Sequence, residues 1–184
     1  MEIFQCILWG SLTYYLGTLL IFILGNRRKI DQTLSNETPI VSVIVAVRNG
    51  ELSLPILLND LSSQDYKGEI EFIIINDESE DKSEDIILNY CEHDPRFRLV
   101  HSNNGHQSLR LKKRALDAGI TSSSGEILLF TDVDCRMSSG WVSSMISYFT
   151  QNIDYVIGNV STDHYNTIVT IFQQIDLHML LTAA

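Results

Sequence analysis

Strand-like apolar segments alternate along this chain with segments whose apolar residues recur at helical spacing. The strand-like segments are residues 41–47 (VSVIVAV), 70–75 (IEFIII), 97–101 (FRLVH) and 126–131 (EILLFT), with residues 155–160 as a candidate fifth strand. Strands that alternate with helices predict βαβ units, and strands that are apolar throughout are typical of a sheet buried on both faces. We therefore expect an α/β fold with a mainly parallel sheet flanked by helices.

Five further segments have the spacing of helices. In the first of them, Leu54, Leu57, Leu58 and Leu61 recur three or four residues apart. The third is basic and amphipathic, and Gly119 is expected to close it. The expected helices are residues 51–63, 83–92, 107–120, 141–149 and 165–181.

The N-terminal segment differs from the rest of the chain, because residues 3–24 carry no charged side chain. As a helix the segment would extend about 33 Å, enough to cross a hydrocarbon core of about 30 Å. It is longer than the apolar part of a signal peptide, and Glu2 stands where a basic leader would be. A basic run at 27–29 follows it, which by the positive-inside rule places the following domain in the cytoplasm. We expect a single-pass anchor in the plasma (inner) membrane.

The charge and the cysteines exclude two classes of protein. A formal net charge of −10 argues against a nucleic-acid partner, because phosphate neutralisation needs a basic face. The cysteines Cys6, Cys91 and Cys135 form no CxxC pair, so neither a disulfide framework nor a zinc cluster is predicted. Unpaired thiols fit a reducing compartment.

Polar runs follow three of the expected strands. They are residues 48–51 (RNGE), 76–81 (NDESED) and 131–134 (TDVD). In open α/β sheets, ligands bind beyond the carboxyl ends of the strands, so these runs are expected to meet at one site. For each run alone, a solvated turn remains an alternative.

Asp132 and Asp134 form the most informative pair in these runs. Residues i and i+2 of an extended segment point to the same side, so both carboxylates can reach one cation. Mg²⁺ and Mn²⁺ favour a few carboxylate oxygens together with substrate phosphate oxygens. The alternative is that one carboxylate caps the helix that begins near Ser138, although serines there can serve as caps themselves.

Three other folds with an aspartate after a strand lack a required element here. A P-loop ATPase needs GxxxxGK[ST], and a dinucleotide-binding fold needs GxGxxG after its first strand, where this chain has VRNGELSLP. A haloacid-dehalogenase-like phosphatase carries DxDx[TV] on its first strand, whereas here the pair follows the fourth strand and Arg136 takes the last position.

Two further positions are candidates for contacts with a nucleotide. Asp77 can accept hydrogen bonds from a nucleobase imide or a ribose hydroxyl. The basic helix can reach toward phosphates, and of its cations Arg110, Lys112, Lys113 and Arg114 we single out Lys113. A solvated basic face is the alternative for the others.

Four motifs in order resemble the family 2 glycosyltransferases of GT-A fold: VSVIVAVRNGE, EFIIINDESED, KKRALDAGI and SSGEILLFTDVDCRMSSGW. The resemblance covers about residues 41–149 and continues more weakly through FQQIDLHML. The chain departs from the family in having Asn76-Asp77-Glu78 where Asp-Asp-Gly is commoner, and Ala46 where proline is usual.

The resemblance implies a metal-dependent glycosyltransferase that uses Mg²⁺ or Mn²⁺ and a nucleoside-diphosphate sugar, UDP-linked, with a lipid-linked or glycan acceptor at the membrane. It implies that Asp77 contacts the base and that Asp132 and Asp134 form the metal-binding DxD. The nucleotide-sugar site would comprise Val47, Arg48, Asn49, Glu51, Asp77, Lys113, Asp132 and Val133. The expected organisation is an anchor with its basic flank at 1–29, a linker at 30–40, a GT-A nucleotide-sugar-binding domain at 41–164 and the start of an acceptor-side region at 165–184.

Sugar transfer in inverting members of such a family needs a general base, an aspartate or glutamate well downstream of DxD. Asp154, Asp163 and Asp176 are the acidic residues that follow Asp134, and none has the acidic dipeptide context of the family. We expect the base to lie beyond Ala184. A nucleotidyltransferase of similar fold and a non-catalytic nucleotide-binding fragment remain alternatives.

Overall fold

The computed structural model describes residues 2–26, 37–150, 153–158, 160–161, 167 and 170. The chain divides into two compact units. One unit is Leu34–Phe149, and the other combines Met1–Thr33 with Thr150–Ala184.

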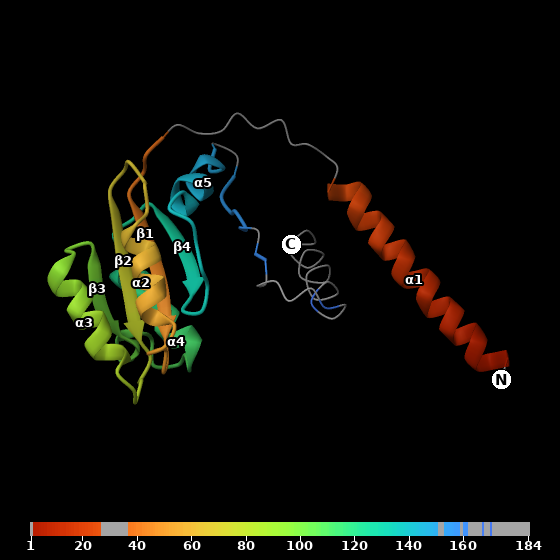
Figure 1. The fold of residues 1–184 in the computed structure, drawn as a ribbon, viewed down its shortest axis with the longest axis horizontal. Helices are drawn as coiled ribbons and strands as arrows, with labels where there is room; N and C mark the ends of the chain where they lie inside the picture. The colour runs from red at the N-terminus through yellow and green to blue at the C-terminus, as the bar shows by residue number, and fades with distance from the viewer. Residues whose placement is uncertain are drawn as a thin grey trace. The chain divides into compact units, whose positions relative to one another are not determined.

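The larger unit is built on a sheet of four parallel strands in the order β3-β2-β1-β4 (Figure 1). Its strands are β1 (Val41–Val47), β2 (Ile70–Asn76), β3 (Phe97–His101) and β4 (Ile127–Asp132). The predicted parallel sheet is confirmed, and each of these strands lies within one residue of its expected bounds. The register pairs Val47 with Asn76 and Ala46 with Asp132, so β1, β2 and β4 end at the same edge.

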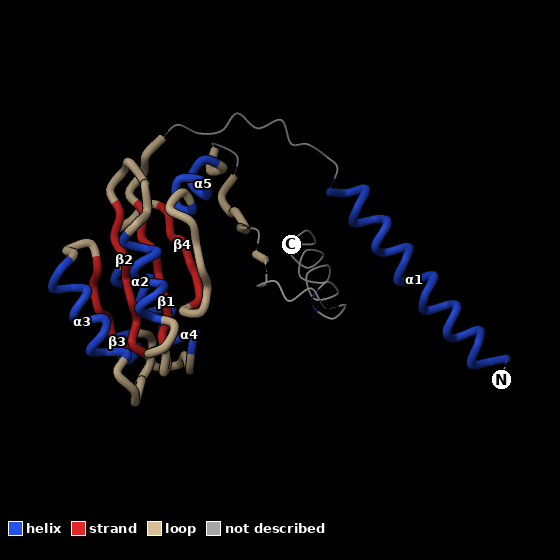
Figure 2. The backbone as a smooth tube through the Cα atoms, in the orientation of Figure 1, coloured by secondary structure: helices blue, strands red, loops and turns tan. Residues whose placement is uncertain are grey.

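Helices cover both faces of this sheet (Figure 2). They are α2 (Leu54–Ser62), α3 (Ser83–His93), α4 (Lys112–Ser122) and α5 (Trp141–Ser147), with a short 3₁₀ turn η1 (Ser102–Asn104) after β3. Alternate β1 side chains such as Val43 and Val45 pack with residues of α2, α3 and α5, while Ile44 packs on the other face with Ala115 and Ala118 of α4. The expectation of a sheet buried on both faces is therefore confirmed.

Helix α4 differs from its prediction at both ends. It begins at Lys112 rather than at residue 107, because Leu111 has a positive φ of 53°, a conformation that a helix does not continue through. Gly119 does not close the helix. A Cβ at Gly119 would lie 2.7 Å from Ile44 Cγ2 and 2.8 Å from Ile75 Cδ1, so this glycine lets the helix approach the sheet.

Helix α2 also begins later than expected, at Leu54 instead of residue 51. Pro55 stands in its first turn, where the missing N–H costs nothing. The residues before it form a turn in which the Ser53 and Leu54 amides donate to the Gly50 carbonyl at 3.0 and 2.9 Å. The polar run after β1 is therefore a loop rather than part of a helix.

The expected fifth strand at 155–160 is wrong for the residues that the structure describes there, 155–158 and 160, none of which is in a strand. Their side chains do not enter a core: Tyr155 is 79% exposed and Val160 is 50% exposed. Strand preference in such residues reflects packing on a half-buried surface, and these side chains lack that packing. The expected helix at 165–181 lies outside the described residues except for 167 and 170.

The N-terminal segment forms one helix, α1 (Glu2–Asn26). Within it Glu2–Ile21 is long and apolar enough to cross a membrane, by length and composition, and none of its most apolar window is buried. Such a helix is weak evidence for a membrane span when taken alone. The basic run at 27–29 lies outside the described residues.

Candidate functional site

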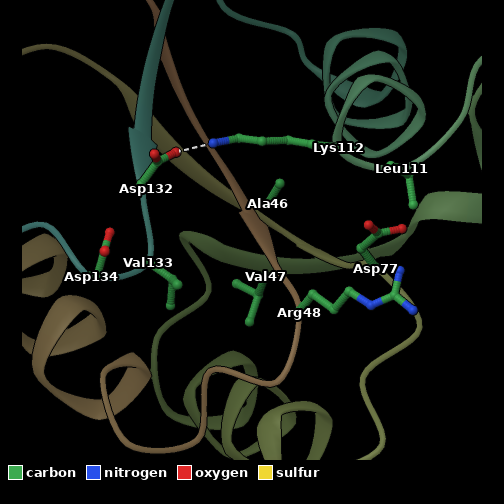
Figure 3. A pocket seen from close by; sticks show the side chains of 9 residues that line it. All are labelled: Ala46, Val47, Arg48, Asp77, Leu111, Lys112, Asp132, Val133 and Asp134. Carbon is green, nitrogen blue, oxygen red and sulfur yellow. Dashed lines mark hydrogen bonds and ion pairs between the residues drawn. The ribbon is translucent and has the colours of Figure 1, made fainter.

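A pocket of about 400 Å³ opens where β1, β2 and β4 end. Figure 3 shows the side chains around it, which come from the end of β1 and the residue after it, from the residue after β2, from the end of β4 and the two residues after it, and from the start of α4 with the residue before it. Six of the residues predicted for the site line this pocket: Val47, Arg48, Asp77, Asp132, Val133 and Asp134. Ala46, Leu111 and Lys112 complete its lining.

The backbone hydrogen bonds of the sheet bring Asp77 to this position. Its amide donates to the Val47 carbonyl at 2.8 Å, which extends the pairing of β1 and β2 by one residue. The Asp77 residue is only 8% exposed, yet it lines the pocket. A nearly buried carboxylate at a pocket wall can accept hydrogen bonds from a bound polar ligand.

The two aspartates of the DVD run, Asp132-Val133-Asp134, line the same pocket, and Figure 3 shows the Asp132 carboxylate turned toward Lys112. The ammonium of Lys112 pairs with Asp132 Oδ1, and both side chains are more than half exposed. Among the described residues no group of three or more His, Cys, Asp or Glu side chains could hold a metal ion. A divalent cation here would therefore take Asp132 and Asp134 from the chain and its other oxygens from substrate and water. This donor set fits Mg²⁺ or Mn²⁺.

Lys112, not Lys113, is the lysine that lines the pocket. The two are neighbours in the first turn of α4, so they point about 100° apart around the helix axis. The sequence alone did not predict which of the two lysines faces the pocket, because this depends on the residue at which the helix begins. The role predicted for Lys113 stays a prediction.

Asn49 and Glu51 are absent from the pocket lining and instead join the loops that follow β1 and β2. The Asn49 side-chain oxygen accepts from the Glu80 amide at 2.8 Å, and the Glu51 carboxylate accepts from the Lys82 amide at 3.2 Å. In return, the amides of residues 49, 50 and 51 donate to the side chains of Ser79, Ser83 and Asp81 at 3.1, 2.9 and 3.0 Å. The Ser83 hydrogen bonds lower the pKa of Asp81, which favours its charged, accepting form.

The same loop lies close to the DVD run through Gly50. A Cβ at Gly50 would stand 3.0 Å from both Val47 Cγ1 and Val133 Cγ2. A side chain at this position would push apart the loop after β1 and the run after β4. The contact explains why a glycine suits the position beside the pocket.

The residues after Asp134 are held by helix α2. The guanidinium of Arg136 donates to Asp60 from Nε at 2.7 Å and from a terminal nitrogen at 3.2 Å, and the Met137 amide donates to Asp60 at 3.2 Å. The Arg136 guanidinium holds the pKa of the Asp60 carboxyl below its usual value. Asp60 and Arg136 were not predicted as a pair, because no local pattern connects positions so far apart in the chain.

Of the acidic residues considered as a base, only Asp154 lies in the described part of the chain, where it is exposed. It belongs to the unit that does not contain the pocket. Asp163 and Asp176 lie outside the described residues.

Comparison with known proteins agrees with this geometry. Residues 42–174 match the family described as Glycosyl transferase family 2. The putative glycosyltransferase EpsH of Bacillus subtilis is 35% identical over 132 residues, and the match covers 71% of this chain and 36% of that protein. The GalNAc(5)-diNAcBac-PP-undecaprenol beta-1,3-glucosyltransferase of Campylobacter jejuni is 28% identical over 121 residues, with 66% of this chain and 38% of that protein covered.

A solved structure shares the fold. The mannosyltransferase PcManGT from Pyrobaculum calidifontis, in complex with GDP-Man and Mn²⁺, superposes with a TM-score of 0.66 at 20% sequence identity. The superposition covers 77% of this chain and 42% of that one. This chain thus spans about two fifths, or slightly less, of the proteins that it matches. The family model alone covers most of the chain, and the chain belongs to glycosyl transferase family 2.

Proposed function

We propose that the pocket binds the nucleoside diphosphate of a sugar donor together with Mg²⁺ or Mn²⁺. The observation that carries this proposal is the meeting of three carboxylates and two cations in one pocket at the carboxyl edge of the sheet: Asp77, Asp132, Asp134, Arg48 and Lys112. The solved mannosyltransferase of the same fold, whose complex contains GDP-Man and Mn²⁺, supports the choice of ligand class.

Four of these side chains, all but Arg48, have a role that follows from their chemistry. Asp77 accepts hydrogen bonds from the base or ribose, and Asp132 and Asp134 hold the cation. A bound divalent cation would supply Lewis-acid neutralisation of the diphosphate as it leaves. Lys112 pairs with Asp132 in the free chain and is placed to bind a phosphate oxygen once the cation takes over that carboxylate.

Transfer of the sugar is likewise a proposal, because this chain spans only about two fifths, or slightly less, of the proteins that it matches. The acceptor class is lipid-linked or glycan. A relative whose name includes a PP-undecaprenol supports the lipid-linked choice. We propose UDP as the nucleotide.

We also propose that α1 anchors the protein in the plasma membrane, with the pocket on the cytoplasmic side. The length and composition of α1 and the basic run at 27–29 support this arrangement. The proposed domain limits remain 1–29, 30–40, 41–164 and 165–184. Protease protection in inverted and right-side-out vesicles tests the orientation, and digestion of the domain only in inverted vesicles is expected.

Nucleotide binding is the first test of the pocket. In calorimetry on the full chain in detergent, UDP is expected to bind when Mn²⁺ is present and to lose most of its affinity after EDTA. Asp134→Ala is expected to abolish the Mn²⁺ dependence, because it removes one of two protein ligands. Glu92→Ala, an exposed carboxylate at the end of α3, is the control and should bind as the native chain does.

Other results of this titration would point elsewhere. Preference for a nucleoside triphosphate over UDP would indicate a nucleotidyltransferase. A chain that binds no nucleotide at all would contradict the donor site and leave a non-catalytic role.

A further inference from the structure

The segment that follows Asp134 has no regular secondary structure, yet it is held tightly by helix α2. Residues 133–140, between β4 and α5, consist of two turns joined by irregular backbone. Five hydrogen bonds join this segment and the first turn of α5 to Asp60 of α2 and to Gln64, two residues after the end of α2. We call these two residues with Arg136 the α2 clamp.

Asp60 contributes the charged half of the clamp. It stands among the buried leucines of α2 and is 9% exposed, so it occupies a position that an apolar residue would otherwise fill. Its two oxygens receive two bonds from Arg136, the shorter at 2.7 Å, and one from the Met137 amide at 3.2 Å. A nearly buried carboxylate is costly unless it is paired, so this geometry fixes where Arg136 and Met137 lie.

Gln64 contributes the neutral half. It is 8% exposed, and its amide nitrogen donates to the Ser138 carbonyl at 2.8 Å and to the Asp60 carbonyl at 2.9 Å. Its side-chain oxygen accepts from the Val142 amide at 3.0 Å. The next residue adds a backbone bond, from the Asp65 amide to the Ser139 carbonyl at 2.9 Å. The segment is thus tied to α2 from residue 136 to the start of α5.

The first tied residue is two positions from Asp134. The Asp134 carboxylate has no hydrogen bond or ion pair to any other described residue, so its own contacts do not fix its position in the pocket. Asp132 is fixed by its place at the end of β4, whereas Asp134 lies beyond the strand. Two things therefore position Asp134: the turn in which the Cys135 amide donates to the Asp132 carbonyl at 3.2 Å, and the way in which the residues after that turn are held.

We propose that Asp60 is a positioning residue for the metal site, acting through Arg136 to hold the segment that presents Asp134 to the cation. This inference rests on the proposed function, since it assumes that Asp134 binds the metal. Groups that orient metal ligands typically change metal affinity by about 10–100-fold when they are removed. The clamp then sets metal affinity without touching the metal.

A second ion pair of the same chemistry serves as a matched control. Asp94 and Arg96 form a bidentate pair with a shortest distance of 2.7 Å, and Arg96 also lowers the pKa of Asp94. This pair lies between the end of α3 and β3, at the edge of the sheet opposite to β4. Arg96 also donates to the Ser62 carbonyl at the end of α2 at 2.8 Å, so the control variant changes Asp94, which makes no bond to α2, and leaves Arg96 in place. Its loss should cost stability but leave the metal site unchanged.

The test compares Asp60→Asn, Arg136→Gln and Asp94→Asn in the full chain in detergent. Binding of Mn²⁺ at saturating UDP is measured by electron paramagnetic resonance of the free ion. Asp60→Asn and Arg136→Gln should each raise the Mn²⁺ dissociation constant about 10-fold. The double variant should raise it no further, because each single variant already breaks the Asp60–Arg136 pair. Arg136→Lys keeps one charged donor, so its Mn²⁺ dissociation constant should lie between those of the native chain and Arg136→Gln. Asp94→Asn should bind Mn²⁺ as the native chain does.

A metal-free measurement accompanies the titration. Hydrogen exchange of residues 135–139 should accelerate in Asp60→Asn and stay native in Asp94→Asn. If Asp60→Asn does not fold, Arg136→Gln still decides the outcome, because Arg136 is 64% exposed and its loss is tolerable.

The outcomes separate the clamp from the donor site. Native Mn²⁺ affinity in Arg136→Gln, with binding lost in Asp134→Ala, overturns the clamp and leaves the proposed function standing. Mn²⁺ binding that survives in Asp134→Ala overturns the proposed function instead.

Discussion

At the scale of single residues, the pocket depends on which of two adjacent lysines faces it. Lys112 lines the pocket and pairs with Asp132, while Lys113 is exposed and is not part of the lining. The start of α4 decides this choice. Leu111, held at φ 53°, ends the preceding loop and sets the helix phase.

Substitution of the two lysines tests the assignment. Lys112→Gln should weaken UDP binding in the presence of Mn²⁺ about 10-fold, or about 1.4 kcal/mol, because it removes a charge-assisted hydrogen bond to phosphate. Lys113→Gln removes the same charge one residue away and should change binding less than about 2-fold. Titration calorimetry measures both. A larger loss of UDP affinity in Lys113→Gln than in Lys112→Gln would indicate that Lys113 is the phosphate ligand.

At the scale of elements, loops and a helix are held where the site needs them by close contacts. Gly50 brings the loop after β1 against Val133, and the side chains of Asn49 and Glu51 join it to the loop after β2. Gly119 brings α4 against Ile44 and Ile75, which places Lys112 at the pocket. Each contact positions a loop or helix, and residues of that loop or helix, or next to it, line the pocket.

Gly119→Ala tests whether packing or helix propensity decides the stability of α4. Propensity alone would make alanine more stable by about 1 kcal/mol. The new Cβ would overlap Ile75 Cδ1 at 2.8 Å and Ile44 Cγ2 at 2.7 Å, and overpacking of this kind costs about 1–3 kcal/mol. We therefore expect net destabilisation in urea unfolding followed by circular dichroism.

A second variant separates the packing cost from other causes. Ile75→Val removes Cδ1, so Gly119→Ala combined with Ile75→Val should lose less stability than the two single changes summed. If the stability losses of the two single variants add up to that of the double variant, the clash with Ile75 is not the cause of the destabilisation by Gly119→Ala.

At the scale of the whole molecule, three carboxylates of the larger unit have lowered pKa values, and two of them, Asp60 and Glu71, connect parts that are distant in the chain. Arg136 lowers the pKa of Asp60, and Arg96 lowers that of Asp94. Burial by itself would raise the pKa of Glu71, but hydrogen bonds from Ser42 and Ser124 outweigh it and lower the pKa overall. These contacts link α2 to the segment after β4, and β1 and β2 to the turn before β4.

The stability of the fold should therefore fall in acid. A carboxyl whose pKa is lower in the folded chain stabilises the fold above its unfolded pKa, and this contribution is lost as the pH falls through the folded pKa. The midpoint of thermal unfolding should stay level near neutrality and drop below about pH 4. Scanning calorimetry from about pH 7 to pH 3 measures it. Asp94→Asn should reduce the drop, and a midpoint independent of pH over this range would contradict the ion-pair account.

The four parallel strands, and the meeting of the polar runs after β1, β2 and β4, follow from local sequence patterns. Strand residues that are apolar on both sides can be buried only inside a layered sheet, and parallel strands end at a common edge. The DVD run, Asp77 and Arg48 could therefore be placed together from local pattern alone, and the structure has them line one pocket.

The neighbours that complete that pocket, and the contacts that hold it, depend on tertiary packing. The choice of Lys112 over Lys113 depends on the phase of α4, and the roles of Asn49 and Glu51 depend on a loop that reaches them from β2. The bond between Asp60 and Arg136 joins positions 76 residues apart. Periodicity reports which face of an element is buried, whereas these contacts depend on how elements distant in the chain pack against each other.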